Sequence, residues 1–434
     1  MLEGAIVYTT PQRAAWLRTA TPTPPERRLA EATTADVVVV GAGYAGLNAA
    51  IRSAEHGRSA IVLEAETPGF GASGRNGGQV IPGLKHDPAE LISMLGERRG
   101  IALTRFAGDA PARTFELIAQ HRMDCDASSC GWLQPATSVQ SLEAVVRRAT
   151  AWSAVTGIAP RVLNAAETQR MTGTDRYVGS WIDQRGGQLQ PLSYARELAR
   201  VALDHGVRIF ANSPAGKLSR RQDGWTVEVN SYVVKARAVV ICTNGYTGRL
   251  LPGLERSFVP ASSIMCSTRP LDPSLRRVIL PGQLPVSDAR RLLNYMRFDS
   301  EGRFMIGARG SFGLHEPESY FAWLRRTGQA IFPALQDAEW EDAWGGRFAL
   351  TIDHLPHIYQ PEPGLLATLG CNGRGVAIMS QIGRLLGDLA AGALPLTESP
   401  VPVSPIRPLP LHAARRPVLE AAALFYRALD RVGR

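Results

Sequence analysis

Short runs of apolar residues alternate with glycine-rich turns along this chain. Residues 37–40 are four valines, a run typical of a strand that is buried on both faces of a parallel sheet. Residues 44–56 then carry apolar side chains at helical spacing and stop before Gly57, where a left-handed cap would end a helix. Residues 59–63 form a second apolar run. The pattern therefore predicts a strand–helix–strand unit.

A similar order returns near the end of the chain. Residues 236–241 and 365–369 read as buried strands, and glycines and a helix at about 377–389 follow the second of them. Residues 292–298 and 303–307 instead alternate between apolar and polar side chains, as in an antiparallel sheet with one wet face. Further helices are expected at about 88–120, 141–155, 192–205 and 418–432, and a hairpin at 224–234.

The first unit carries the pattern of a dinucleotide site. Gly41, Gly43 and Gly46 have the G-x-G-x-x-G spacing, which allows a tight turn, a close approach to a pyrophosphate and close packing of helix on strand. The helix N-terminus offers N–H groups to phosphate. Glu64, at the tip of the second strand, is placed to bind the ribose hydroxyls. The candidate contacts are Gly41, Gly43, Tyr44, Ala45, Gly46, Glu64 and Ala65.

A glycine-rich loop follows this unit at residues 71–79. It suits a backbone that passes close to a flat ligand and donates N–H groups to it, although a flexible surface loop is the alternative. Its polar side chains offer further donors to phosphate, ribityl hydroxyls or ring carbonyls. The candidate residues are Gly71, Ala72, Ser73, Gly74, Arg75, Asn76, Gly77, Gly78 and Gln79.

Later segments return the chain to the same ligand. The helix after residues 370–376 aims a second N-terminus at it, which would stabilise negative charge on a reduced flavin. Three glycine-rich contacts spread along the chain exceed what a nicotinamide or adenine nucleotide alone requires, whereas FAD needs them all. The later candidate contacts are Thr243, Asn244, Gly245, Trp344, Gly346, Gly373, Arg374, Gly375 and Val376.

Composition narrows the class of protein. The 434 residues suffice for two domains, and 45% hydrophobic and 20% charged residues are ordinary for a soluble enzyme. No apolar run reaches the ~20 residues of a bilayer span, and no export signal is visible. Five scattered cysteines without a C-x-x-C pair argue against a disulfide framework and against a zinc site. We therefore expect a cytoplasmic protein with no membrane partner and no metal.

The net charge of +9 comes almost wholly from arginine, because the chain has lysine only at positions 85, 217 and 235. Basic proteins often bind nucleic acid. The arginines are dispersed as singles and pairs, however, and aromatic residues do not alternate with them. A solvated arginine-rich surface is therefore the favoured interpretation, and an acidic substrate or partner stays open.

These motifs together resemble a known family. The G-A-G-Y-A-G unit, the 71–79 loop, the Trp344-Gly-Gly-Arg turn with residues 350–357, and the 370–376 turn are similar to FAD-dependent amine and amino-acid oxidoreductases of the D-amino-acid-oxidase (DAO) type. The gamma-glutamylputrescine oxidase branch is the most similar. The resemblance covers nearly the whole chain, and the 71–79 loop is its most specific part.

The resemblance implies an α/β fold in which a Rossmann-type FAD-binding domain carries an inserted antiparallel-sheet domain that roofs the flavin. The corresponding boundaries are an N-terminal arm at 1–34, the FAD-binding domain at 35–87, 161–248 and 344–395, the substrate domain at 88–160 and 249–343, and a C-terminal tail and helix at 396–434.

The resemblance also implies oxidation of a C–N bond, with hydride passing to the flavin, hydrolysis of the imine to an aldehyde, and reduction of O2 to hydrogen peroxide. Some relatives attach the flavin to a cysteine near residues 344–357, but this chain has none between Cys266 and Cys371, so non-covalent FAD is expected. Related oxidases often place a lysine near the flavin to activate oxygen. Lys85 is the candidate here; a solvated Lys85 would instead favour a dehydrogenase.

Substrate contacts are open at this point. Tyr295 and Arg297 share one face of an expected roof strand, and an arginine there, or Arg309 on the next strand, could bind a carboxylate. An arginine paired with an acid at the rim is equally compatible with the pattern. Trp132 is a candidate aromatic wall or a core residue.

His354 and His357 are candidates for proton transfer or for structural roles. The leading hypothesis is an oxidase of a small amine. The alternatives are an amine dehydrogenase with another acceptor, a tRNA-modifying flavoenzyme of the same fold, and an FAD-binding protein without turnover. The oligomeric state is not predicted.

Overall fold

The valine run lies in β1 (Thr33–Val40), a central strand of a mixed sheet. β1 pairs in parallel with β2 (Ala60–Leu63) and with β11 (Tyr232–Ile241). This first sheet has the order β17-β18-β11-β1-β2-β8, and β10 and β9 extend it antiparallel from β11. Its other strands are β8 (Arg208–Phe210), β9 (Ala215–Arg221), β10 (Gly224–Val229), β17 (His357–Glu362) and β18 (Leu365–Leu369).

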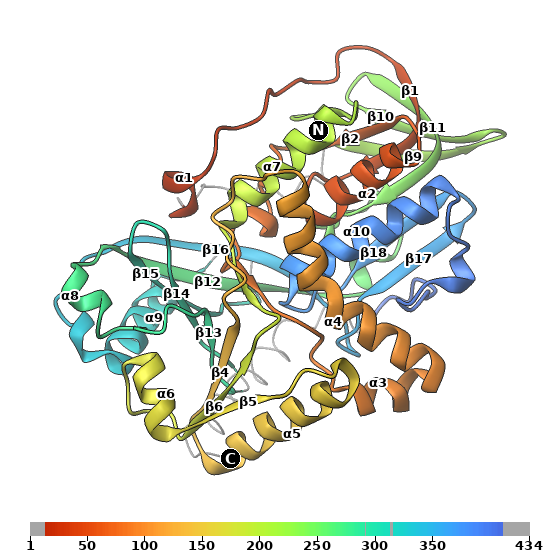
Figure 1. Cartoon of the computed structure of the whole chain (residues 1–434). Helices are drawn as coiled ribbons and strands as arrows, with labels where there is room; N and C mark the ends of the chain where they lie inside the picture. Colours follow the sequence, from red (N-terminus) through yellow and green to blue (C-terminus); the bar gives the residue numbers. More distant parts are fainter. Residues whose placement is uncertain (1–13, 291, 313–315, 411–434) are drawn as a thin grey trace.

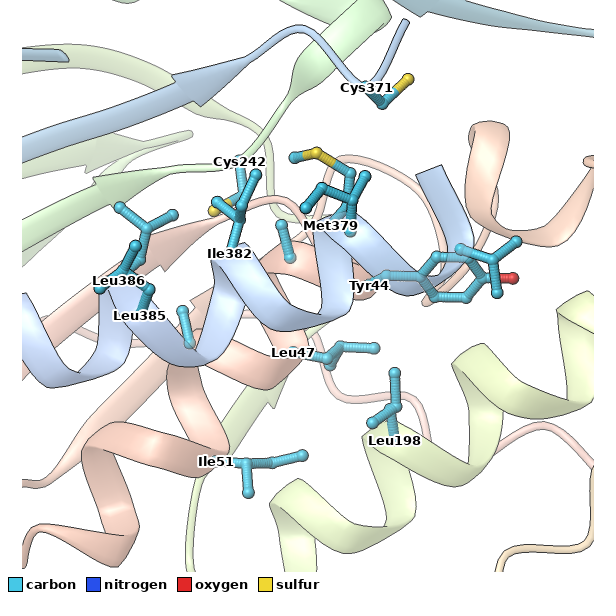
Figure 2. Close-up of a cluster of buried hydrophobic side chains, with 14 of the residues drawn as sticks. Tyr44, Leu47, Ile51, Leu198, Cys242, Cys371, Met379, Ile382, Leu385 and Leu386 are labelled. Carbon is cyan, nitrogen blue, oxygen red and sulfur yellow. The ribbon is translucent and has the colours of Figure 1, made fainter. Parts of the chain in front are cut away.

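Three helices pack together beside this sheet: α2 (Tyr44–Glu55), α7 (Pro191–Asp204) and α10 (Gly375–Ala391). Figure 2 shows Ile382 and Leu386 of α10 within the same buried cluster as Leu47 and Ile51 of α2 and Leu198 of α7. Burial of this apolar surface stabilises the nucleotide-binding unit.

The second sheet is mainly antiparallel, with the order β16-β12-β15-β14-β13-β4-β6-β5 and one parallel pair, β13 with β4. Figure 1 shows it at the left and below, away from β1 and β2 at the upper right. Its strands are β4 (Trp132–Ala136), β5 (Arg161–Asn164), β6 (Gly179–Asp183), β12 (Val259–Pro270), β13 (Val286–Ser287), β14 (Tyr295–Phe298), β15 (Arg303–Arg309) and β16 (Trp340–Leu350). The helices α5 (Val139–Thr156), α6 (Ala165–Thr172), α8 (Pro273–Arg276) and α9 (Glu318–Ile331) accompany it.

The helical pattern at 88–120 forms two helices, α3 (Pro88–Leu95) and α4 (Glu97–Gln120). The break lies at Gly96, which has φ +78°, a conformation that favours glycine and interrupts a helix. Asp87 starts α3 through a capping box with Glu90. The remaining elements are α1 (Trp16–Thr19) and the two-stranded ribbon of β3 (Gln79–Val80) with β7 (Gly187–Gln188).

The strand pairing differs from the predicted domain boundaries at two places. β5 and β6 lie in the second sheet, next to β4, although residues 161–248 were assigned to the FAD-binding domain. β16 begins before residue 344 and pairs with β12 along its whole length, so the second sheet also extends past that boundary. A domain boundary depends on which strands pair with each other. These partners are far apart in sequence, so local sequence patterns do not reveal the pairing.

The structure describes residues 14–290, 292–312 and 316–410. The helix expected at 418–432 lies outside these residues. Within them, no helix is both long enough and apolar enough to cross a membrane.

Candidate active site

The glycines of the first unit occupy positions that exclude a side chain. Gly41 has φ +103°, and a Cβ there would lie 2.9 Å from the carbonyl oxygen of Cys242. A Cβ on Gly46 would lie 1.9 Å from the carbonyl oxygen of Gly41. The N-cap of α2 is Gly43, which has no side chain to cap the helix, so the N–H groups of Ala45 and Gly46 are left for a ligand. These features fit the pyrophosphate of FAD.

The tip of β2 provides the carboxylate that the sequence predicts for ribose binding. Glu64 accepts hydrogen bonds from the backbone N–H groups of Ala42 (2.7 Å) and Glu66 (3.0 Å). Burial raises its pKa, although these hydrogen bonds act in the opposite direction. Beside it, an open cavity of about 560 Å³ is lined by Glu26, Arg27, Arg28, Ala65 and Asn212. This cavity can hold the adenosine end of the cofactor.

The 71–79 loop folds across the start of α2. The Ser73 hydroxyl accepts a hydrogen bond from the Tyr44 N–H (3.1 Å), and the Tyr44 hydroxyl donates to the Ser73 carbonyl (2.6 Å). The Asn76 amide donates to the carbonyls of Ala72 and Ser73 and accepts the Gly78 N–H at 2.8 Å. Asn76 therefore fixes the shape of the loop, which leaves backbone groups as the main donors to a ligand.

Two other polar side chains of the loop also bind protein groups. Gln79 is buried; its amide donates to the Val286 carbonyl (3.0 Å) and accepts from the Ser287 hydroxyl (2.6 Å). Arg75 donates to the Phe70 carbonyl (2.8 Å) and lies over the Phe70 ring. Gln79 thus joins the loop to the second sheet and has no free donor for a ligand, whereas Arg75 keeps N–H groups of its guanidinium that could still donate.

The turn in β16, which is predicted to reach the cofactor, contacts the same loop. The Trp344 indole N–H donates to the Arg75 carbonyl (2.9 Å). A Cβ on Gly346 would lie 3.0 Å from the Cβ of Arg75. Tyr246, which was not predicted, covers Gly71: a Cβ there would lie 3.0 Å from its ring.

Arg297 does not have the role expected for it. The structure buries it fully, and its guanidinium donates to the carbonyls of Gly78 (3.1 Å) and Leu189 (2.7 Å) and lies over the Trp16 ring. Burial lowers its pKa to about 10. Arg297 therefore supports the glycine loop through these carbonyls and is not a substrate-binding residue.

The two aromatic candidates also make protein contacts. The Tyr295 hydroxyl lies 2.8 Å from the Ser263 hydroxyl, and its ring packs on Gly77, where a Cβ would lie 2.7 Å away. Trp132 is a buried residue whose indole N–H donates to Ser287 (3.1 Å). One face of its ring receives the Arg374 guanidinium at 5.6 Å, so Trp132 forms a wall behind that arginine.

Lys85, Arg309 and Arg374 lie near one another and form a group of cations. Burial lowers the pKa of Lys85 to about 8, and the nearby charges of Arg309 and Arg374 lower it further. The pKa of Arg374 is lowered to about 9, again mainly by burial. Arg309 lies 5.6 Å from the centre of the Phe348 ring. Within the described part of the chain, none of these three cations forms an ion pair with a carboxylate.

His354 lies beside this cation group and has the left-handed conformation, with φ +54°. Burial and then the charge of Lys85 lower its pKa, so the ring is neutral near pH 7. Its buried Nδ1 has no partner among the described residues. His357 instead bonds to Asp353 (3.0 Å) and Ser404 (2.8 Å) and is structural.

The N-terminus of α10 points to the same side of the first sheet as the N-terminus of α2. Gly383 packs on Ala45 and Gly387 on Ala49, so α10 and α2 run parallel. No described side chain caps α10, whose first turn contains Gly375 and Val376 after Gly373 and Arg374.

The tip of β11 meets this turn. The Asn244 amide donates to the Cys371 sulfur (3.2 Å), and the amide oxygen of Asn244 is buried without a partner among the described residues. Gly245 packs on the backbone of Phe348, and the Thr243 and Thr247 hydroxyls lie 2.7 Å apart. The structure therefore brings the three predicted glycine-rich segments to one side of the first sheet.

Comparison with known proteins decides the family. A family model described as FAD dependent oxidoreductase (DAO) matches residues 36–389. The chain belongs to the DAO family. It is therefore an FAD-dependent oxidoreductase that acts on amine or amino-acid substrates, as the resemblance of its motifs to this family implies.

Individual DAO relatives cover most of the chain. Gamma-glutamylputrescine oxidoreductase of Escherichia coli is 28% identical over 411 residues, which are 93% of this chain and 95% of that protein. A probable oxidoreductase of Haemophilus influenzae is 29% identical over 82% of this chain and 83% of its own. The crystal structure of glycine oxidase from Geobacillus kaustophilus superposes with a TM-score of 0.71 at 22% identity, covering 84% of this chain and 96% of that one.

Sequence reasoning missed the residues that support the DAO loop. The Trp16 indole N–H donates to the Asn76 carbonyl (2.8 Å), and Trp16 packs edge-on against Trp344. Phe348 orients Arg309. The sequence signal for this role was the presence of a tryptophan in the N-terminal arm. Tryptophan is mostly buried in proteins, so an arm that carries it is expected to pack on the body of the protein.

Proposed function

We propose that this DAO-family enzyme oxidises a C–N bond in a small amine that also carries a carboxylate, as gamma-glutamylputrescine does, and passes the electrons to O2. One observation carries the proposal: Lys85, Arg309 and Arg374 are partly buried cations without a carboxylate partner among the described residues. Uncompensated buried charge is costly. An anionic substrate would remove that cost and gain charge-assisted hydrogen bonds.

Each side chain has a distinct role in this proposal. Arg309, held by the Phe348 ring, binds the substrate carboxylate with its planar donors. His354 is neutral and takes the proton that an ammonium substrate must lose before oxidation. Lys85 places positive charge where oxygen is reduced. Bound FAD supplies the hydride acceptor. We propose that FAD binds non-covalently, since the sulfur of Cys371 accepts a hydrogen bond from the Asn244 amide.

Two alternatives remain distinguishable. A dehydrogenase would use another acceptor and leave O2 unreduced. A tRNA-modifying enzyme would act on no small amine, and its RNA binding would weaken steeply with salt.

The test is anaerobic bleaching of the purified yellow protein by single amines, followed by admission of air and a peroxide assay. The panel contains gamma-glutamylputrescine, putrescine, sarcosine and several amino acids. We expect bleaching by an amine with a carboxylate, and peroxide after air. Bleaching without rapid reoxidation would indicate the dehydrogenase, and no bleaching by any small amine would refute the proposal.

A further inference from the structure

The helices α2, α4 and α7 end at one place, far from the glycine motif. Glu55 is the last residue of α2, His121 follows α4, and His205 follows α7. The glycine motif lies at the other end of α2, ~18 Å away for a helix of 12 residues. Figure 1 shows α2 and α7 in the upper half of the molecule and α4 running up toward them.

The three side chains meet within metal-binding range. One ligand atom from each of Glu55, His121 and His205 lies within 4.8 Å of the others. The two imidazole rings contact edge to face, with centroids 5.4 Å apart. Ligands of a tetrahedral zinc ion at about 2.0–2.2 Å lie about 3.4 Å from one another, so side-chain rotations of the order of 1 Å close the site.

Both histidines present the nitrogen that a metal needs. His205 Nδ1 lies 2.9 Å from the Val201 carbonyl, which can only accept, so this nitrogen carries the proton and Nε2 keeps its lone pair. His121 Nε2 is buried and has no partner among the described residues.

The electrostatics also favour a cation at this position. The carbonyl ends of three helices converge here, and each carries partial negative charge. The carboxylate of Glu55 accepts hydrogen bonds from Arg52 and Arg384. Its Oε2 accepts the short bonds, at 2.8 and 2.9 Å, whereas Oε1 has only a 3.3 Å contact and is available to a metal.

Two arginines near the site have carboxylate partners of their own, whereas Arg384 pairs with Glu55 itself at 2.9 Å. Arg52 also binds Asp388 at 2.6 Å, and Arg200 binds Glu197 and Asp204, each at 2.8 Å. We propose that Glu55, His121 and His205 bind one divalent ion of the zinc class, with water completing the tetrahedron. The ion would tie together the ends of α2, α4 and α7. No local motif reveals such a site, because its ligands come from three separate helices.

The experiment uses tag-free, FAD-loaded enzyme that has been treated with a chelator and dialysed. Zn²⁺ is titrated by calorimetry, and the melting temperature is measured with and without Zn²⁺. We expect one ion per chain and a rise in melting temperature. His121→Gln and His205→Gln should each weaken binding at least 10-fold and abolish the thermal shift.

Asp204→Asn is the matched control, because it changes a charge beside His205 but removes no ligand. Its zinc affinity should stay within about 2-fold of the wild-type value. Unchanged FAD content and melting temperature of the zinc-free variants show that they are folded; should His121→Gln fail this check, the exposed His205 and Glu55 positions carry the test. No zinc binding, or binding equally strong in the histidine variants, would overturn the proposal.

Discussion

Lys85 is the residue whose charge links the structure to the choice of electron acceptor. It is partly buried next to two arginines, and no described carboxylate pairs with it. A positive charge in such a place stabilises negative charge that develops on oxygen as it is reduced. Lys85→Met should therefore slow flavin reoxidation by about 10²-fold and leave anaerobic reduction by substrate nearly unchanged. Stopped-flow measurement of the two half-reactions separates these effects.

The pH dependence of reoxidation follows from the same side chain. Its pKa is lowered to about 8, so Lys85 is charged below that pH and loses its proton as the pH rises through it. We expect the reoxidation rate to be high below pH 8 and to fall above it. Lys85→Met should abolish this inflection; an identical inflection in the variant would show that another group is responsible.

Arg309 is expected to discriminate among substrates. It has no ion-pair partner among the described residues and lies against Phe348. Arg309→Met should raise the KM for a carboxylate-bearing amine by at least 10-fold, because charge-assisted hydrogen bonds contribute about 1.5–3 kcal/mol. The KM for a carboxylate-free amine such as putrescine should change little. Equal effects on both substrates would contradict carboxylate binding by Arg309.

At the scale of elements, the contact between α2 and α10 depends on glycine. A Cβ on Gly383 would lie 2.3 Å from the Ala45 carbonyl oxygen, so a larger residue forces the helices apart. Gly383→Val should cost about 2–3 kcal/mol and lower the melting temperature by about 2–4 °C. FAD should also dissociate more readily, because α2 carries the pyrophosphate contacts. Gly248→Val is the control, since nothing lies within 4 Å of a Cβ there.

The local sequence pattern is sufficient to predict some helices and strands but not others. The glycine spacing and the apolar stripe of residues 44–56 predict α2 almost to the residue, and the four valines predict the second half of β1, which begins four residues earlier at Thr33. β9 was not expected, since its edge position leaves most of its side chains exposed. The strand expected at 236–241 continues from residue 232 as one long β11.

In the candidate site, too, local sequence predicts some residues and misassigns others. Gly41 and Glu64 are recognisable because their roles require a local turn and a strand tip. Arg297 was misassigned because its partners, Gly78 and Leu189, lie 219 and 108 residues away in sequence. A buried arginine that bonds to carbonyls and one that awaits a substrate look alike in sequence, and only tertiary packing separates them.

At the scale of the whole molecule, the N-terminal arm supports the active site. Trp16 is fully buried and bonds to the glycine loop, and Arg18 pairs with Asp342 of β16 at 3.1 Å. Trp16→Ala should cost about 3–5 kcal/mol and reduce the FAD retained after dialysis. Leu17→Ala is the matched control, because Leu17 is 53% exposed in the same turn of helix. Equal FAD retention in both variants would show that the arm does not support the loop.

The order of strands in the first sheet has a consequence for how the cell makes this protein. β1 is synthesised early, but it lies beside β11, and α2 is covered by α10, which ends at Ala391. At about 5–20 residues per second, a ribosome needs ~20–80 s to reach that point. The face of α2 that α10 covers lacks this partner until then, whereas β1 can pair with β2 and β11 much earlier. We therefore expect the cofactor site, to which the N-terminus of α10 contributes, to be completed late in translation.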